Sequence, residues 1–320
     1  MSRQTMDSLV LLGCISLWAG LALAEVGSFS NCTEYFYRGA EPSGLHTPRT
    51  AEICQRYKNQ YRFATLYDKA NRIPRWSAYI LHPSNCPGQP WRLGKWFMEP
   101  QLRSNQAVSK DYEDTSYDQG HLNPNSFQCD ENHRATFTLT NAAPMNPCFN
   151  RIHWSKVERT LKTQLTGNCS NLGGTPYLMT GAVPSNNVKI PIQDEDKEWD
   201  RDRPYNRVSV PSHLWTAVCC NHQDKTHKFS FAFLGENKEE SKLSNLSVDQ
   251  LNEVLPCLYN TPGQIKIFKD DCGSKSQKGQ EVLLAIKSAL YNTFQILLSD
   301  SYSQLLPPVK MINWTGRPPR

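Results

Sequence analysis

Several common sequence signatures are missing from this chain of 320 residues. No C-x-x-C pair occurs, and the adjacent Cys219 and Cys220 lack the spacing of zinc ligands, so a structural zinc site is disfavoured. No G-x-S-x-G elbow occurs, which disfavours a Ser-His-Asp hydrolase. No apolar run after residue 24 reaches the roughly 20 residues that span a bilayer, and no internal repeat is visible.

The first 24 residues have the pattern of a cleaved signal peptide. Arg3 precedes the apolar run LVLLGCISLWAGLALA, which ends in small residues at Ala24. An uncleaved anchor is disfavoured because this run is shorter than a bilayer span. We therefore expect a secreted, extracellular protein whose mature chain begins at Glu25.

Cysteines and glycosylation sequons agree with export. The 11 cysteines less Cys14 leave ten, an even number that predicts disulfides, five if all of them pair, with the pairing left open. Cysteines used in this way are not nucleophiles, which disfavours a Cys-His hydrolase. Sequons predict glycan acceptors at four asparagines, namely Asn31, Asn168, Asn245 and Asn313.

Size and charge set broad limits. Removing 24 residues from 320 leaves 296, enough for one sizeable core or two small ones. The formal net charge of +5 permits a polyanionic partner without requiring one.

Strand and helix patterns alternate irregularly, which predicts an α+β fold. We expect one domain over residues 25–272, followed by a helical extension and flexible tail over 273–320. Residues 111–135 are polar without an apolar period, which predicts an irregular loop. Predicted strands cover 65–81 (two, broken at Ile73-Pro74), 135–146, 177–183, 207–220 and 227–234, and predicted helices cover 247–258 and 281–298.

A further helix is clearly punctuated. Asn146 suits its N-cap, Pro147 its first position and Gly167 its exit. These residues predict a helix over 147–167.

One face of this helix carries polar groups suited to catalysis. Asn150, Trp154 and Glu158 recur every four residues within a sector roughly 80° wide, and Lys162 is next along that flank. Asn150 lies in the first turn, where free backbone N–H groups favour anions. The face thus offers an amide oxygen, a carboxylate and a cation.

The segment YDQGHLNPNSF, residues 117–127, places His121 after Gly120, which would allow a tight turn that aims the imidazole. Histidine is a natural general base near neutral pH, and Mg²⁺ keeps several waters, so one Asn oxygen with Glu-held waters suffices to bind it. These parts suit phosphodiester hydrolysis. Taken alone, such a histidine is more often a surface group. If it is the base, activity should rise with pH near 6.5, the approximate reference pKa of histidine.

YDQGHLNPNS and TFTLTNAAPMNPCFNRIHWSKVERTLK together resemble the active-site region of the DNA/RNA non-specific endonucleases, the ββα-metal nucleases. Their pattern is D-R-G-H, then S-N-x-x-P-Q, then N-x-x-x-W-x-x-x-E, and its last element is intact here. The separation of 29 residues from His121 to Asn150 also fits. The resemblance covers about residues 60–235 and implies a mixed or antiparallel sheet core with flanking helices, stabilised by disulfides.

The resemblance implies a role for each matching residue. His121 would be the general base, Asn150 the direct ligand of Mg²⁺ (or Mn²⁺), and Glu158 the holder of metal-bound waters. Asn141 would support the histidine or a phosphate oxygen. The implied products carry 5′-phosphate and 3′-hydroxyl ends, and DNA and RNA would both be substrates.

Other positions would bind substrate or shape the site. Asp118, Gly120 and Trp154 would be structural there. The candidates for phosphate contacts are four polar residues, namely Gln119, Lys162, Arg92 and Lys95.

Two departures from the family pattern matter. Gln119 stands where the family has an arginine, and losing a charge-assisted contact to the transition state would cost roughly 3 kcal/mol, or ~10²-fold in rate. The family's glutamine is Met145 or Asn146 here. The main alternative is therefore a catalytically weak or inactive secreted glycoprotein that keeps the nuclease fold as a nucleic-acid or protein binding module. Hydrolysis of smaller phosphodiesters is a further alternative.

Overall fold

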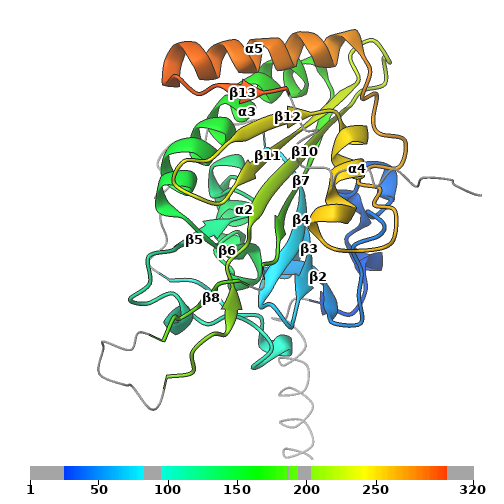
Figure 1. The fold of residues 1–320 in the computed structure, drawn as a ribbon. Helices are drawn as coiled ribbons and strands as arrows, with labels where there is room; N and C mark the ends of the chain where they lie inside the picture. The colour runs from blue at the N-terminus through cyan, green and yellow to red at the C-terminus, as the bar shows by residue number, and fades with distance from the viewer. Residues whose placement is uncertain (1–24, 83–94, 186, 194–202, 301–320) are drawn as a thin grey trace, which may run out of the picture.

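The computed structural model describes residues 25–82, 95–185, 187–193 and 203–300. The predicted signal peptide, Cys86, Arg92 and Asn313 lie outside the described residues. A nine-stranded sheet dominates, with strand order β1-β2-β3-β4-β7-β10-β11-β12-β13 (Figure 1). Neighbouring strands are antiparallel except β12 and β13, so the sheet is mixed. Its strands are β1 (Glu25–Val26), β2 (Thr50–Tyr57), β3 (Gln60–Asp68), β4 (Ile73–Ile80), β7 (Thr175–Val183), β10 (His213–Asn221), β11 (Phe229–Glu236), β12 (Leu243–Leu246) and β13 (Leu298–Ser299).

Two small two-stranded sheets and several helices complete the α+β fold. The small sheets pair β5 (Asp118–His121) with β6 (Ala142–Met145) and β8 (Lys189–Ile190) with β9 (Val208–Ser209). The α-helices are α2 (Asp130–Ala135), α3 (Ser155–Asn168), α4 (Val248–Leu258) and α5 (Gln277–Phe294). The π-helical turn η8 (Phe149–Trp154) precedes α3, and short 3-10 turns are η1 (Phe29–Asn31), η2 (Thr33–Tyr35), η3 (Tyr37–Gly39), η4 (Pro100–Leu102), η5 (Ser109–Asp111), η6 (Asn125–Phe127), η7 (Leu139–Asn141) and η9 (Ser170–Leu172).

Apolar residues on both faces of the large sheet build two cores. Along β7, Leu178 and Ala182 face one cluster, while Met179 and Val183 face the other, because successive strand residues point to opposite faces. Figure 1 shows α3 and α5 over one face and α4 with the N-terminal segment over the other. The candidate site lies on the α3 side.

The structure corrects the sequence-based boundaries around the site. Residues 111–135, predicted to be an irregular loop, contain β5, η6 and α2. The strand predicted over 135–146 begins only at Ala142, because residues 139–141 form a 3-10 turn first. The strand predicted over 207–220 is split into β9 and β10 around Pro211.

The C-terminal helix belongs to the same core as the rest of the domain. Val282, Ile286 and Leu290 of α5 join the cluster that contains α3, and β13 pairs with β12. The helix begins at Gln277, earlier than predicted, with Ser276 as its cap. The α5 helix and β13 therefore pack against the rest of the domain. Within the part of the chain that the structure describes, no helix is both long enough and apolar enough to cross a membrane.

Disulfides stabilise both faces of the sheet. Cys219 and Cys220 are adjacent in β10, so their side chains point to opposite faces and bond different partners. The prediction of disulfides is confirmed, but not all ten cysteines pair, because Cys148 and Cys257 are free, the latter on the exposed side of α4. Cys129 is also disulfide-bonded. The described bridges are Cys32–Cys54, Cys169–Cys220 and Cys219–Cys272.

Candidate active site

The β5–β6 pair carries the histidine. His121 lies opposite Ala142 and Gly120 opposite Ala143 in antiparallel register. A Cβ added to Gly120 would lie 2.2 Å from the sulfur of Met145. Gly120 is therefore needed for close side-chain approach within a strand, and the predicted tight turn at this glycine is wrong.

The helix that follows β6 starts as predicted at Asn146. Its side-chain oxygen accepts the N–H groups of Cys148 at 2.9 Å and Phe149 at 3.2 Å, which satisfies two of the free donors of the first turn. The first turns are π-helical, so the regular 100° spacing assumed for Asn150 does not hold there. Such π-helical turns occur frequently at functional sites. The helix also continues past Gly167 to Asn168.

Asn150 is hydrogen-bonded to Asp118, which also forms an ion pair with Arg151. Its Nδ2 donates to Asp118 Oδ2 at 3.0 Å, and Arg151 binds the same carboxylate through Nε at 2.8 Å and Nη2 at 2.5 Å. A carboxylate only accepts hydrogen bonds, so the amide nitrogen must face it and the amide oxygen faces away. Among the described residues, this oxygen has no hydrogen-bond partner. A neutral oxygen of this kind is a suitable ligand for a hard cation.

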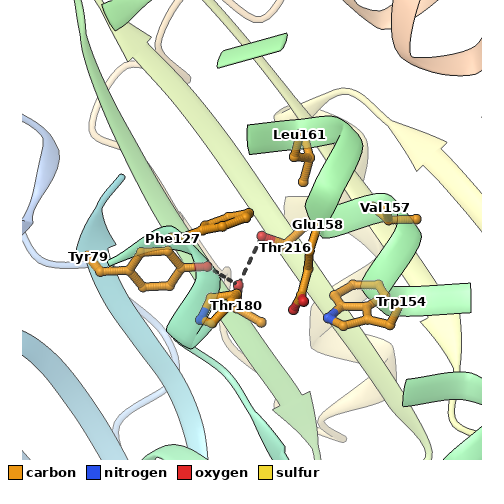
Figure 2. Close-up of a pocket in the computed structure, with 9 residues that line it drawn as sticks. Tyr79, Phe127, Trp154, Val157, Glu158, Leu161, Thr180 and Thr216 are labelled. Atoms are coloured by element: carbon orange, nitrogen blue, oxygen red, sulfur yellow. Dashed lines mark hydrogen bonds between the residues drawn. The ribbon is translucent and has the colours of Figure 1, made fainter. Parts of the chain in front are cut away.

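Glu158 points into the protein rather than into solvent. Figure 2 shows its carboxylate between Trp154 and Thr180. Burial alone raises the pKa of Glu158 to about 8, because no cation offsets the loss of water. The cavity holds about 10 Å³, close to the room needed for one water, and is lined by Tyr79, Pro124, Phe127, Trp154, Val157, Glu158, Leu161, Thr180 and Thr216.

This cavity also connects Glu158 with the histidine segment. Pro124 and Phe127, which follow His121 by three and six residues, form part of its wall. The hydroxyls of Tyr79, Thr180 and Thr216 form a hydrogen-bonded chain beside it, with distances of 2.8 and 3.0 Å.

His121 sits among aromatic rings. Its ring centroid lies 4.6 Å from that of Trp96 and 4.8 Å from that of Phe137, the latter edge to face. Burial, with a smaller effect of His133, lowers the pKa of His121 to about 3. Its Nε2 is buried and has no hydrogen-bond partner among the described residues. The imidazole is therefore neutral at pH 7, unlike the ordinary histidine expected from sequence.

Asn141 is hydrogen-bonded to the chain that follows His121. Its side chain is fully buried, and its oxygen accepts from Ser77 Oγ and from the Asn123 N–H, both at 2.9 Å. Its nitrogen donates to the carbonyls of Asn123 and Thr136. With all of these bonds made, Asn141 cannot reach a phosphate oxygen, so that part of its predicted role is wrong. It fixes the chain two residues after His121.

Lys162 has a similar supporting position. Its Nζ donates to the carbonyl of Ser126 at 2.5 Å, and burial lowers its pKa. The lysine thus ties α3 to the loop beyond His121.

An open groove of about 550 Å³ lies next to the histidine. The predicted substrate contacts Lys95 and Gln119 line it, and so does Trp96, which contacts His121. Sequence reasoning missed Trp96 and Arg151, since neither belongs to a periodic or motif-like pattern. The lining residues are Lys95, Trp96, Ser109, Tyr112, Glu113, Tyr117, Asp118 and Gln119.

The fold is the α+β arrangement expected from sequence, with these side chains around β5, β6 and η8. Residues 43–261 match the family model of the DNA/RNA non-specific endonucleases, which is more than half of the chain. The chain belongs to this family.

Curated relatives agree with the family assignment. An endonuclease domain-containing 1 protein of Homo sapiens is 28% identical over 320 residues, covering 92% of this chain and 58% of that protein. The Mus musculus protein of the same name is 28% identical, covering 83% and 52%. A nuclease of Nostoc sp. is 26% identical over 187 residues, covering 56% and 58%. The chain thus spans about half the length of the mammalian relatives.

A solved structure of an EndoG/EndoGI complex is also similar. It has a TM-score of 0.49 and 18% sequence identity, and the match covers 69% of this chain and 86% of the other.

Proposed function

We propose that this chain is a secreted, divalent-metal-dependent endonuclease that hydrolyses phosphodiester bonds in both DNA and RNA. The observation that carries the proposal is the clamp on Asn150, whose amide nitrogen is bound by Asp118 so that its oxygen is left to bind a cation. Asp118 begins the same four-residue strand that ends at His121. Base and ligand therefore come from one unit of β5, β6 and η8.

Each residue then has a defined task. His121, neutral at physiological pH, accepts a proton from the attacking water. Asn150 would hold Mg²⁺ or Mn²⁺ directly and Glu158 through water, and such an ion supplies electrostatic stabilisation of the charge that develops on the phosphate oxygens. Gln119 and Lys95 contact the backbone phosphates from the groove. Because phosphates rather than base edges are bound, the sugar and sequence matter little.

The proposal is tested with purified secreted protein on supercoiled plasmid and on structured RNA. Cleavage is expected with Mg²⁺ and not with EDTA, giving 5′-phosphate and 3′-hydroxyl ends. His121→Ala should abolish cleavage, whereas His227→Ala, a control on the β10–β11 turn, should not. If the wild-type chain leaves both substrates intact over a range of pH and metals, the enzyme proposal fails. Comparing a dinucleotide with a long duplex distinguishes an endonuclease from a hydrolase of small phosphodiesters.

The second candidate is a binding module that keeps the fold without efficient catalysis. Gln119 favours it, because an uncharged amide lines the groove where the family has an arginine. Nucleic-acid binding without cleavage would support this candidate.

Secretion and glycosylation are part of the proposal. Asn31 is exposed, and Asn168 is half-buried at the end of α3. Asn245 is only 8% exposed in β12 and its Nδ2 donates to Asp300, so a glycan there would require the strand to be uncovered. A loss of mass on glycosidase treatment that Asn31→Gln removes is the expected result.

A further inference from the structure

Arg151 is an exposed cation held rigidly at the edge of the groove. Its Nε and Nη2 bind the two oxygens of Asp118, a residue that lines the groove, while 60% of the side chain stays exposed. A bidentate pair of this kind fixes the plane of the guanidinium. The arginine is therefore preorganised rather than free to move with solvent.

The guanidinium has donors to spare. Arginine carries five N–H donors, of which the Asp118 carboxylate uses two. The remaining donors lie on the far edge of the planar group, since the near edge faces Asp118. Three N–H groups in a fixed plane match the oxygens of a phosphate.

The groove otherwise has little positive charge among the described residues. Lys95 is the one basic side chain in its described lining, against the carboxylates of Glu113 and Asp118. Lys162 is turned to the Ser126 carbonyl, and position 119 holds a glutamine. A phosphate in this groove would need a further cation, and Arg151 is bonded directly to its wall.

We propose that Arg151 binds the phosphodiester backbone next to Asn150 and takes the place of the arginine that the family has at position 119. This inference rests on the proposed function and adds a substrate-binding residue to it. The Asp118 pair lowers the net charge at the arginine, but it fixes the position of a planar donor set beside the cation ligand. Arg151 and Asn150 both donate to Asp118 Oδ2, so the shared carboxylate brings their two side chains together.

The decisive measurement is binding of a fluorescent single strand of about 16 nucleotides in EDTA, so that cleavage does not interfere. Arg151→Gln should bind about 10-fold more weakly and should reduce the slope of log Kd against log salt by roughly 0.7, the value for one phosphate contact on a single strand. Arg159→Gln, which removes an exposed arginine two turns further along the helix, is the matched control. Equal slopes for the two variants would overturn the inference.

A second-site variant tests whether Arg151 replaces the arginine that the family has at position 119. Adding Gln119→Arg to Arg151→Gln should return the salt slope to the wild-type value, because the charge then stands where the family has it. A double variant with the slope of Arg151→Gln would contradict a shared phosphate. Arg151→Lys keeps one charge and should keep most of the slope, which guards against misfolding of the glutamine variant.

Cleavage assays separate this inference from the proposed function. If the wild-type chain cuts, Arg151→Gln should lower kcat/KM by ~10² at unchanged Tm, as expected for a lost charge-assisted contact in the transition state. Unchanged kcat/KM would overturn the inference while leaving the nuclease proposal intact. If no variant cuts, the nuclease proposal fails, and the binding slopes still decide the role of Arg151.

Discussion

Two half-buried titratable side chains at the site have pKa values displaced in opposite directions. Burial lowers the pKa of His121 to about 3 and raises that of Glu158 to about 8, so without a metal both are uncharged at pH 7. Desolvation disfavours the charged form of each group. A cation bound beside Glu158 would favour the ionised carboxylate and so release its proton.

Glu158 should make the metal-free protein less stable as pH rises. The folded state keeps a proton that the unfolded carboxyl loses above its pKa of 4.5, so stability falls between pH 4.5 and about 8. The difference of 3.5 pKa units corresponds to at most about 5 kcal/mol. Glu158→Gln lacks this penalty, so its stability advantage over wild type in EDTA should grow from pH 5 to pH 8 in urea unfolding. Parallel curves for the two proteins would contradict the buried carboxyl.

His121 should not limit the pH dependence near its ordinary pKa. Because burial lowers that pKa to about 3, the imidazole is already unprotonated at pH 5. At saturating metal, log kcat/KM should therefore show no ionisation near pH 6.5, in contrast to the expectation from sequence alone. A clear limb with a midpoint near 6.5 would show that His121 is solvated.

Sequence predicted the residues that lie in motifs and missed those defined by distant contacts. His121, Asn150 and Glu158 follow the spacing of the family pattern. The role of Arg151 depends on its bond to Asp118, which is 33 residues away in sequence. No local sequence pattern predicts that bond. The same reason hid the burial of Asn141, whose partners lie as far away as Ser77.

At the scale of elements, β5 and β6 are too short to be recognised alone. Each has four residues, and their pairing depends on register over an intervening segment that contains α2. Strands such as β7 and β11 were predictable because their apolar residues are continuous or alternate over eight or more positions. The helix α4 was predictable from Ser247, whose side chain accepts the Gln250 N–H at 3.1 Å.

Gly120 allows β5 and β6 to approach, so enlarging it should be costly. Gly120→Ala places a methyl group 2.2 Å from Met145, and we expect about 1–3 kcal/mol of destabilisation by urea unfolding. Met145→Ala in the same chain should recover part of that loss, which a double-mutant cycle measures. Gly167→Ala is the control, since a methyl group there would meet no atom within 4 Å and the position is helical. Equal effects at both glycines would rule out the predicted contact.

At the scale of the whole molecule, helices cover both faces of the large sheet, and disulfides link the sheet to segments on each face. An α+β class and the ends of many strands followed from periodicity, but strand order did not, because it depends on contacts between distant segments. For the same reason, sequence did not show where α5 packs: the helix is amphipathic by sequence, and only the fold shows that its apolar face covers the main core.

The bridge from β10 to Cys272 should stabilise the fold substantially. It closes a separation of 53 residues, and removing a disulfide of this kind typically costs about 2–4 kcal/mol. Cys219→Ser with Cys272→Ser should lower Tm and the urea midpoint accordingly. Cys257→Ser, at an exposed free cysteine, should leave both unchanged. Similar stabilities for the two proteins would refute the bridge.

The most direct test of the account is a crystal of the protein soaked in Mn²⁺, with anomalous scattering collected at the manganese edge. An anomalous peak in contact with Asn150 Oδ1, on the side of the amide away from Asp118, is the predicted result. Manganese bound elsewhere, with the Asn150 oxygen hydrogen-bonded to protein, would contradict it.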